Sequence, residues 1–130
     1  MTVRNYVAIL GAVIVGALVS GCWQGWQMDY GKPAGQFLAA EVVGKGGAYV
    51  GKKVTIKGTV LRVDTSVPDD AVVVLENGIT CKFGKFAAMA DQYKVGETIY
   101  VDGYLKRCKP EDVLMEPAMG RDPKAPFDAE

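Results

Sequence analysis

The feature that most constrains the fold is a period-two alternation of apolar and polar side chains over Lys53–Val63. Val54 and Ile56 lie on one face of this stretch and polar residues lie on the other, which predicts a long, half-buried β-strand. Gly58 interrupts the alternation. A glycine inside a strand permits a sharp bend or a bulge, so one long strand can serve both halves of a small barrel.

Four shorter segments also have the pattern of strands. Ala71–Leu75 is a β-branched run, and it is joined to Ile79–Phe83 by Glu76-Asn77-Gly78, which is a strong hairpin turn. Thr98–Lys106 alternates again, and Val113–Met115 begins a last short strand after a turn that contains proline. With the long stretch at the front, these segments predict five strands.

Two segments have helical periodicity. Pro33 is suited to the first turn of a helix, and a short amphipathic pattern follows it before several glycines end it. The positions that form this pattern are Phe37, Leu38, Glu41 and Val42. A second apolar stripe, between the third and fourth strands, repeats at helical spacing over about two turns. Its members are Phe86, Met89, Ala90 and Tyr93.

The order of these elements predicts the OB-fold, a mainly β, five-stranded Greek-key barrel whose short helix lies between strands 3 and 4 and plugs one end. A short N-terminal helix precedes the barrel. Another small barrel, or an open antiparallel sheet with one helix, is the alternative. We expect a leader over residues 1–21, a tether over 22–32, the OB-fold domain over 33–119 and a flexible tail over 120–130, where mixed charge shows no periodicity.

The leader has the pattern of an export signal. Arg4 gives it a weakly basic start, and Tyr6–Val19 is uncharged and apolar, about the length of a secretory signal core and short for a membrane span. Leu18-Val19-Ser20-Gly21-Cys22 resembles the bacterial lipobox, in which an aliphatic and two small residues precede the cysteine that accepts lipid. We therefore predict cleavage of the signal peptide before Cys22 and lipidation of its thiol. An uncleaved transmembrane anchor is the alternative.

Lipid on Cys22 predicts a protein anchored in the cell envelope, because two or more acyl chains hold a protein stably on a membrane. Trp23, rather than an aspartate, follows the cysteine. In lipoproteins of Gram-negative bacteria, this resemblance favours the outer membrane, facing the periplasm. The partners expected from this location are the membrane itself and an envelope protein, peptide or glycan.

Assigning Cys22 to lipid leaves Cys81 and Cys108 as an even pair in an oxidising compartment. In the OB topology, strand four hands over to strand five at the end where strand three begins, so these two cysteines are expected to approach each other. A disulfide would close a loop of about 28 residues and stabilise the domain by about 3–4 kcal/mol. The alternative is two separate reduced thiols, with Cys81 packed as a small core residue.

Three short motifs lie in and around the predicted strands. They are Tyr49-Val50-Gly51-Lys52-Lys53-Val54 leading into Ile56-Lys57-Gly58-Thr59-Val60, then Thr80-Cys81-Lys82-Phe83, then Val95-Gly96-Glu97-Thr98-Ile99-Tyr100-Val101-Asp102-Gly103. On these motifs the chain resembles the tRNA-anti-like OB-fold domains that are common in small bacterial lipoproteins, over roughly Phe37–Met119. The resemblance implies the OB-fold. It brings no catalytic residues to this chain and does not demonstrate RNA binding.

Composition argues against several classes of function. The chain contains no histidine, which removes the commonest general base and metal ligand. Its 15 basic residues are balanced by 15 acidic ones, whereas non-specific binding of nucleic acid needs an excess of cations. No constellation of nucleophile, base and oxyanion donors is visible. We therefore expect no enzyme activity, no cofactor and no metal site.

The predicted function is that of a membrane-anchored envelope lipoprotein whose OB-fold is a non-catalytic binding or structural module for a protein, peptide or glycan partner. The alternative is an oligonucleotide- or small-ligand-binding sensor. OB-folds bind mainly on strands two and three and on the adjoining loops, which are acidic here, so nucleic acid is not the expected partner. The candidate binding residues are Lys82, Tyr100, Tyr104, Lys106 and Arg107.

Overall fold

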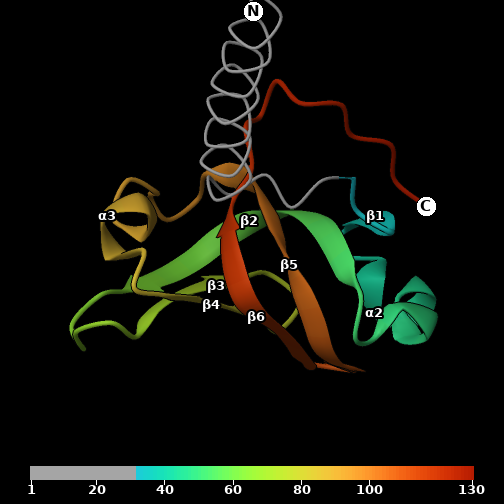
Figure 1. The fold of residues 1–130 in the computed structure, drawn as a ribbon, viewed down its shortest axis with the longest axis horizontal. Coiled ribbons are helices and arrows are strands. Elements are labelled where there is room, and N and C mark those ends of the chain that lie inside the picture. The colour runs from blue at the N-terminus through green and yellow to red at the C-terminus, as the bar shows by residue number, and fades with distance from the viewer. Residues whose placement is uncertain (1–31) are drawn as a thin grey trace, which may run out of the picture. The chain divides into compact units, whose positions relative to one another are not determined.

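The long alternating stretch forms strand β2 (Lys53–Asp64) in the computed structural model, which describes residues 32–130 (Figure 1). The first half of β2 pairs in parallel with β1 (Gly35–Leu38), and its second half pairs antiparallel with β3 (Ala71–Leu75). The first half also pairs antiparallel with β5 (Thr98–Lys109). One strand therefore contributes to both halves of the sheet, as the sequence predicted.

A glycine and a bulge allow β2 to change neighbours. A Cβ atom on Gly58 would lie 2.9 Å from the Cβ of Ala39 and 3.2 Å from a methyl carbon of Leu75, so only glycine allows this close approach without a shift of its neighbours. The register of β2 against β3 then shifts between Val60 and Arg62. The irregularity that the sequence predicted is thus a bulge, and it follows Gly58 along the strand.

The remaining strands close the barrel. β4 (Ile79–Gly84) pairs antiparallel with β3 and in parallel with β6 (Asp112–Gly120), and β6 pairs antiparallel with β5. The order β2-β3-β4-β6-β5, joined by the pairing of β2 with β5, is the connectivity of the OB-fold. The predicted mainly β fold class is confirmed, and the last strand is longer than the sequence indicated.

Inward-facing side chains fill the barrel, because successive residues of a strand point to opposite faces. Residues 33–130 form one compact unit around this core. The largest fully buried side chains are Phe37, Val42, Val54, Ile56, Val60, Val73, Leu75, Ile79, Phe83, Leu105, Met115 and Met119. The core is therefore aliphatic, with two phenylalanines among these side chains.

The predicted plug is present as α3 (Ala87–Ala90), one helical turn between β4 and β5. Ala90 is buried, and Phe86, Met89 and Tyr93 pack against the core. The Tyr93 ring meets Phe83 edge-on, with 6.0 Å between centroids. All four residues of the apolar stripe therefore face the barrel, although the helix is shorter than the two turns expected.

The region before the barrel differs from the expectation. Gly35–Leu38 forms β1, so a helix beginning at Pro33 is wrong, and the N-terminal helix is confined to α2 (Val42–Lys45). A short 3₁₀ turn, η1 (Gly47–Tyr49), follows it. Pairing with β2 explains the strand, because it satisfies the main-chain groups of these residues while burying the Phe37 side chain.

The segment after β6, Arg121–Glu130, contains no helix or strand. We name it the tail segment. A flexible tail was predicted over residues 120–130; in the structure, Gly120 ends β6, Phe127 packs against Tyr100 of β5, and the chain ends near β1, to which it donates hydrogen bonds (Figure 1). The leader, the lipobox and Cys22 lie outside the described residues. Within residues 32–130, none of the helices has the length and hydrophobicity required to cross a membrane.

The β3–β4 turn gives a direct test of the fold. Asn77 and Gly78 have φ values of 64° and 71°, and a Cβ atom on Gly78 would lie 2.6–2.7 Å from main-chain atoms of Glu111. We expect Gly78→Ala to lower the free energy of unfolding by at least about 2 kcal/mol, because it combines left-handed strain with a main-chain clash. Urea unfolding followed by circular dichroism measures this change.

Gly47→Ala is the matched control, since nothing lies within 4 Å of a Cβ atom there. Its stability should stay within about 1 kcal/mol of the wild type. Equal stability losses in the two variants would contradict the described turn.

Candidate binding surfaces

Strand register places five residues side by side across the outward surface of the barrel. Their order is Arg62, Val74, Thr80, Leu114 and Arg107, and we name them the cross-strand row. The three central residues are half-buried, and the two arginines at the ends are exposed. The row crosses β3 and β4, which are the second and third strands of the barrel. It therefore lies on the face where OB-folds usually bind.

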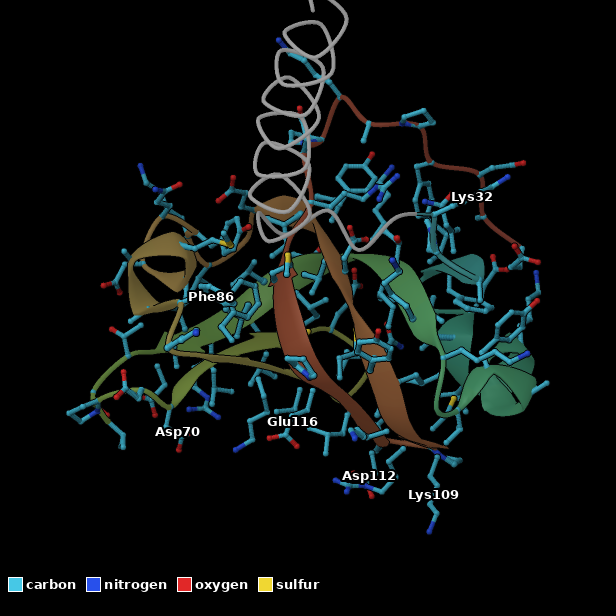
Figure 2. The ribbon with its side chains drawn as sticks, in the orientation of Figure 1. Lys32, Asp70, Phe86, Lys109, Asp112 and Glu116 are labelled. Atoms are coloured by element: carbon cyan, nitrogen blue, oxygen red, sulfur yellow. The ribbon has the colours of Figure 1, made fainter. Side chains whose placement is uncertain are left out.

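Three cations on this surface are paired with carboxylates. The pairs are Arg62–Asp64 at 3.5 Å, Lys82–Asp70 at 3.6 Å and Arg107–Asp112 at 2.9 Å. Such exposed pairs contribute little to stability, but they offset the positive charge that a phosphate backbone would contact. Figure 2 shows Asp70, Glu116 and Asp112 following one another along one edge of the barrel. The three cations therefore lie among carboxylates, and Lys109 lies near Asp112 at the end of the same edge.

The loop that leaves β2 holds an ionised carboxylate beside the row. The hydroxyl and the main-chain N–H of Ser66 donate to Oδ1 of Asp64 at 2.6 and 3.0 Å. These hydrogen bonds, together with the charge of Arg62, lower the pKa of Asp64 below its usual value. Thr65 Oγ1 donates to Asp91 Oδ1 at 2.8 Å, which ties the loop to the end of α3.

Aromatic side chains are missing from the outward sides of β3 and β4, both of which the structure describes completely. Phe83 is the one aromatic residue in these two strands, and it is buried in the core. Binding of single-stranded nucleic acid usually combines a positive groove with exposed aromatic rings on which bases stack. The cross-strand row offers half-buried aliphatic side chains instead.

A second surface is formed by the outward side of β5 and the first half of β2. Tyr100 lies opposite Lys57, whose Nζ is 5.5 Å from the centroid of the tyrosine ring. Phe127 of the tail segment packs edge-on against the same ring, at 5.3 Å and 68°. Tyr104 lies opposite Lys53 and is 38% exposed. We name this surface the β2–β5 face.

The candidate binding residues inferred from the sequence do not form one surface. Lys82 lies on β4 and Arg107 in the cross-strand row, whereas Tyr100 and Tyr104 lie on the β2–β5 face. Lys106 is exposed where the register of β5 shifts against β6. Strand β6 separates β4 from β5, so spacing along each strand could not show that these residues are apart.

A partly buried polar network beneath the tail segment was not anticipated. Asp102 and Arg121 form an ion pair at 3.1 Å with side chains that are 15% and 16% exposed. The hydroxyl of Thr55, which is fully buried, donates to the other carboxylate oxygen. Thr55 and Asp102 are polar residues directly opposite each other on paired strands. This pairing is the sequence feature that could have indicated the network. The network fixes the direction in which the chain leaves β6.

The cysteines lie apart, and the expected disulfide is not present. Cys81 and Cys108 are both free thiols. Cys81 pairs with Met115 of β6, and Cys108 pairs with Val113 on the other edge of the same strand. Adjacent strands lie about 4.8 Å apart, so the two Cα atoms are separated by roughly 9 Å or more, beyond the limit of about 7 Å for a disulfide. The prediction overlooked that β6 lies between them.

The two thiols have different surroundings. Burial raises the pKa of Cys81 to about 12, and it also raises the pKa of Cys108, which is only partly buried. The Cys108 thiol donates to the main-chain oxygen of Val42 at 3.3 Å. Both thiols are therefore poor nucleophiles near neutral pH.

A shallow pocket of about 290 Å³ lies between α3, the start of β5 and the tail segment. It is lined by Gln92, Tyr93, Glu97, Thr98, Ile99, Tyr100, Arg121 and Pro123. Burial, followed by the negative charge of Glu97, raises the pKa of Tyr93, so its hydroxyl stays protonated near neutral pH. Across residues 32–130, no cluster of three or more His, Cys, Asp or Glu side chains could hold a metal ion.

No family model matches the sequence, and no curated protein matches it. Among solved structures, the chain is similar to a "putative nucleic acid-binding lipoprotein" from Klebsiella pneumoniae, with a TM-score of 0.44 and 13% identity over 65% of this chain and 79% of that one. It is also similar to a "putative aspartyl-tRNA synthetase" from Leishmania major, with a TM-score of 0.47 and 15% identity. That match covers 78% of this chain but only 24% of the synthetase. The OB-fold assignment rests on the strand order and pairing of this chain.

Thiol labelling tests the separation of the cysteines. In the Cys22→Ser variant, without reductant, we expect an alkylating reagent at pH 8 to label Cys108 in the folded protein. Cys81 should react at least roughly a thousandfold more slowly until the domain unfolds, because its labelling requires opening of the core. Peptide mapping by mass spectrometry distinguishes the two sites. Two thiols that stay unlabelled in urea until reductant is added would show a disulfide.

Proposed function

We propose that the chain is an envelope lipoprotein whose OB-fold is a non-catalytic binding module for a protein or peptide partner. The observation that carries the proposal is the cross-strand row, in which Val74, Thr80 and Leu114 are half-buried between two ion pairs. The lipid anchor is supported by the sequence pattern that ends at Cys22. Its location in the envelope follows from that anchor, with the outer membrane favoured in a Gram-negative cell.

The centre of the row favours a protein partner. Val72 and Val74 of β3 and Leu114 of β6 lie on either side of β4, and all three side chains are half-buried, so each leaves part of its apolar surface exposed. Protein interfaces typically have an apolar centre with few charges and a polar rim. Arg62 and Arg107, each held by a carboxylate, supply such a rim at the two ends of the row.

Electrostatics disfavour a polyanionic ligand on this face. A phosphate backbone is bound by cations that can release their counterions, and each contact adds to the salt dependence of binding. Here Arg62, Lys82 and Arg107 already have carboxylate partners, and the adjoining loop carries the ionised Asp64. A nucleic acid would have to break these pairs and approach further acidic side chains.

The thiols and acids of the domain favour binding over catalysis. The pKa values of Cys81 and Cys108 are raised, which disfavours thiolate chemistry. Asp64 is paired and exposed, the usual condition of a surface carboxylate. The absence of histidine from the whole sequence removes the most frequent partner for an activated nucleophile.

Variants of the row test the partner class. We expect Val74→Asp to abolish crosslinking to an envelope protein in intact membranes, because a charge in the centre of an apolar contact costs at least about 2 kcal/mol of binding energy. Val95→Asp is the matched control, since Val95 is 71% exposed in the turn before β5. Equal unfolding midpoints would show that both variants fold. Two results together would reject a protein partner. The wild-type protein would be retained on an oligonucleotide array at physiological salt, and Val74→Asp would form the same protein crosslinks as the wild type.

Mass spectrometry of the native protein tests the anchor separately. The mature chain should begin at Cys22 and carry a diacylglycerol-derived mass on that residue, and Cys22→Ser should leave the chain unlipidated. A chain that still begins at Met1 with an unmodified Cys22 would reject lipidation without affecting the binding proposal.

A further inference from the structure

The tail segment lies on the barrel as a bound peptide would. After a turn in which Asp122 accepts hydrogen bonds from the main chain of Lys124 and Ala125, it continues past Tyr100 of β5 and reaches Gln36 of β1 (Figure 1). These contacts join positions about 90 residues apart in the sequence. The occupied surface is the β2–β5 face and not the cross-strand row.

Gln36 contacts the main chain of the tail segment at three alternate residues. Its side-chain oxygen accepts from the N–H of Asp128 at 2.7 Å, and its side-chain nitrogen donates to the carbonyl of Pro126 at 3.3 Å. The main-chain oxygen of Gln36 accepts from the N–H of Glu130 at 2.7 Å. A carboxamide carries one donor group and one acceptor, so it can pair with the backbone of any extended segment, whatever its side chains.

Phe127 supplies the side-chain anchor. Its ring packs edge-on against Tyr100 at 5.3 Å, in the geometry that aromatic pairs prefer, while Lys57 lies over the Tyr100 ring. Phe127 is half-buried, whereas Pro126 and Asp128 on either side of it are exposed. The contact therefore selects an aromatic residue at one position and leaves the neighbouring side chains largely unconstrained.

Two further side chains hold the end of the docked stretch. Lys45 Nζ donates to the main-chain oxygen of Glu130 at 2.8 Å, and the Tyr49 hydroxyl donates to Oε1 of Glu130 at 3.4 Å. The end near α2 and η1 is therefore suited to an acidic residue, three positions after the aromatic one.

We propose that this surface is a peptide-binding site for an extended partner segment that carries an aromatic residue followed three positions later by an acidic one. Pro126–Glu130 occupies the site within the same chain and competes with the partner segment. The site is defined by Gln36, Lys45, Tyr49, Lys57 and Tyr100. It is separate from the cross-strand row, so it does not depend on the lipid anchor or on the proposed partner of that row.

The contacts favour a peptide over other ligands. Four of the hydrogen bonds from the site reach main-chain N–H or carbonyl groups of the tail segment, which are groups that only a polypeptide presents at this spacing. A tethered segment acts at a millimolar effective concentration, so competition weakens the apparent affinity for an external peptide of moderate affinity by roughly tenfold.

Fluorescence anisotropy with a labelled synthetic peptide tests the site. The peptide has the sequence of residues 123–130, and the proteins are the full chain, the full chain with Phe127→Ala, and a chain stopped after Arg121. We expect both altered chains to bind the peptide at least roughly tenfold more tightly than the full chain, because the competing segment is weakened or removed. If the shortened chain does not fold, the Phe127→Ala chain still shows whether weakening the tail segment strengthens peptide binding.

Matched substitutions locate the binding. In the Phe127→Ala background, Tyr100→Ala and Gln36→Ala should each weaken peptide binding by at least roughly tenfold, since each removes a direct contact. Val95→Ala, at a side chain that is 71% exposed in the turn before β5, should leave peptide binding unchanged. Absence of binding to folded Phe127→Ala protein, or binding that survives both Tyr100→Ala and Gln36→Ala, would overturn the proposal.

Discussion

The barrel depends on one strand pairing with different neighbours along its length. β2 meets β1 and β5 near its start and β3 near its end, and it changes neighbours just after Gly58. The lack of a side chain there lets Ala39 and Leu75 approach the backbone. If β2 stayed straight, the sheet would remain open and leave unpaired edges, which are prone to associate with other chains. Closure removes those edges and creates the buried interior in one step.

The same closure divides the outside of the barrel into two regions with different chemistry. The cross-strand row has Thr80 at its centre between Val74 and Leu114, and it has an ion pair at each end. The β2–β5 face instead carries Tyr100 and the polar network around Asp102, and the tail segment covers part of it. The two regions share strands β2 and β5, but the residues of the row are different from those that contact the tail segment.

Much of the barrel could be predicted because the local signals agreed with the tertiary fold. Alternation, the Asn77-Gly78 turn and the helical stripe each identified an element that the structure contains. The signals failed where tertiary pairing decided the outcome. Phe37 fits a helix as well as a strand by local pattern, and pairing with β2 selected the strand. The tail segment has no local periodicity, but Asp128 and Gln36 meet across about 90 residues, a contact that no local pattern indicates.

Surface predictions were less accurate than those for the core, for a related reason. Whether a side chain is buried follows from its position within a strand. Whether two side chains from different strands lie on the same surface depends on which strands are neighbours. Strand β6 lies between β4 and β5. It therefore separates Lys82 from Tyr100, and it also separates Cys81 from Cys108. One detail of strand order thus accounts for both corrections.

Strand order also affects how the domain reaches its native state. With Cys81 enclosed by aliphatic neighbours and Cys108 held against α2, the barrel is complete without a covalent crosslink. The barrel therefore depends on strand pairing and buried side chains, and it closes only when β5 and β6 are both in place.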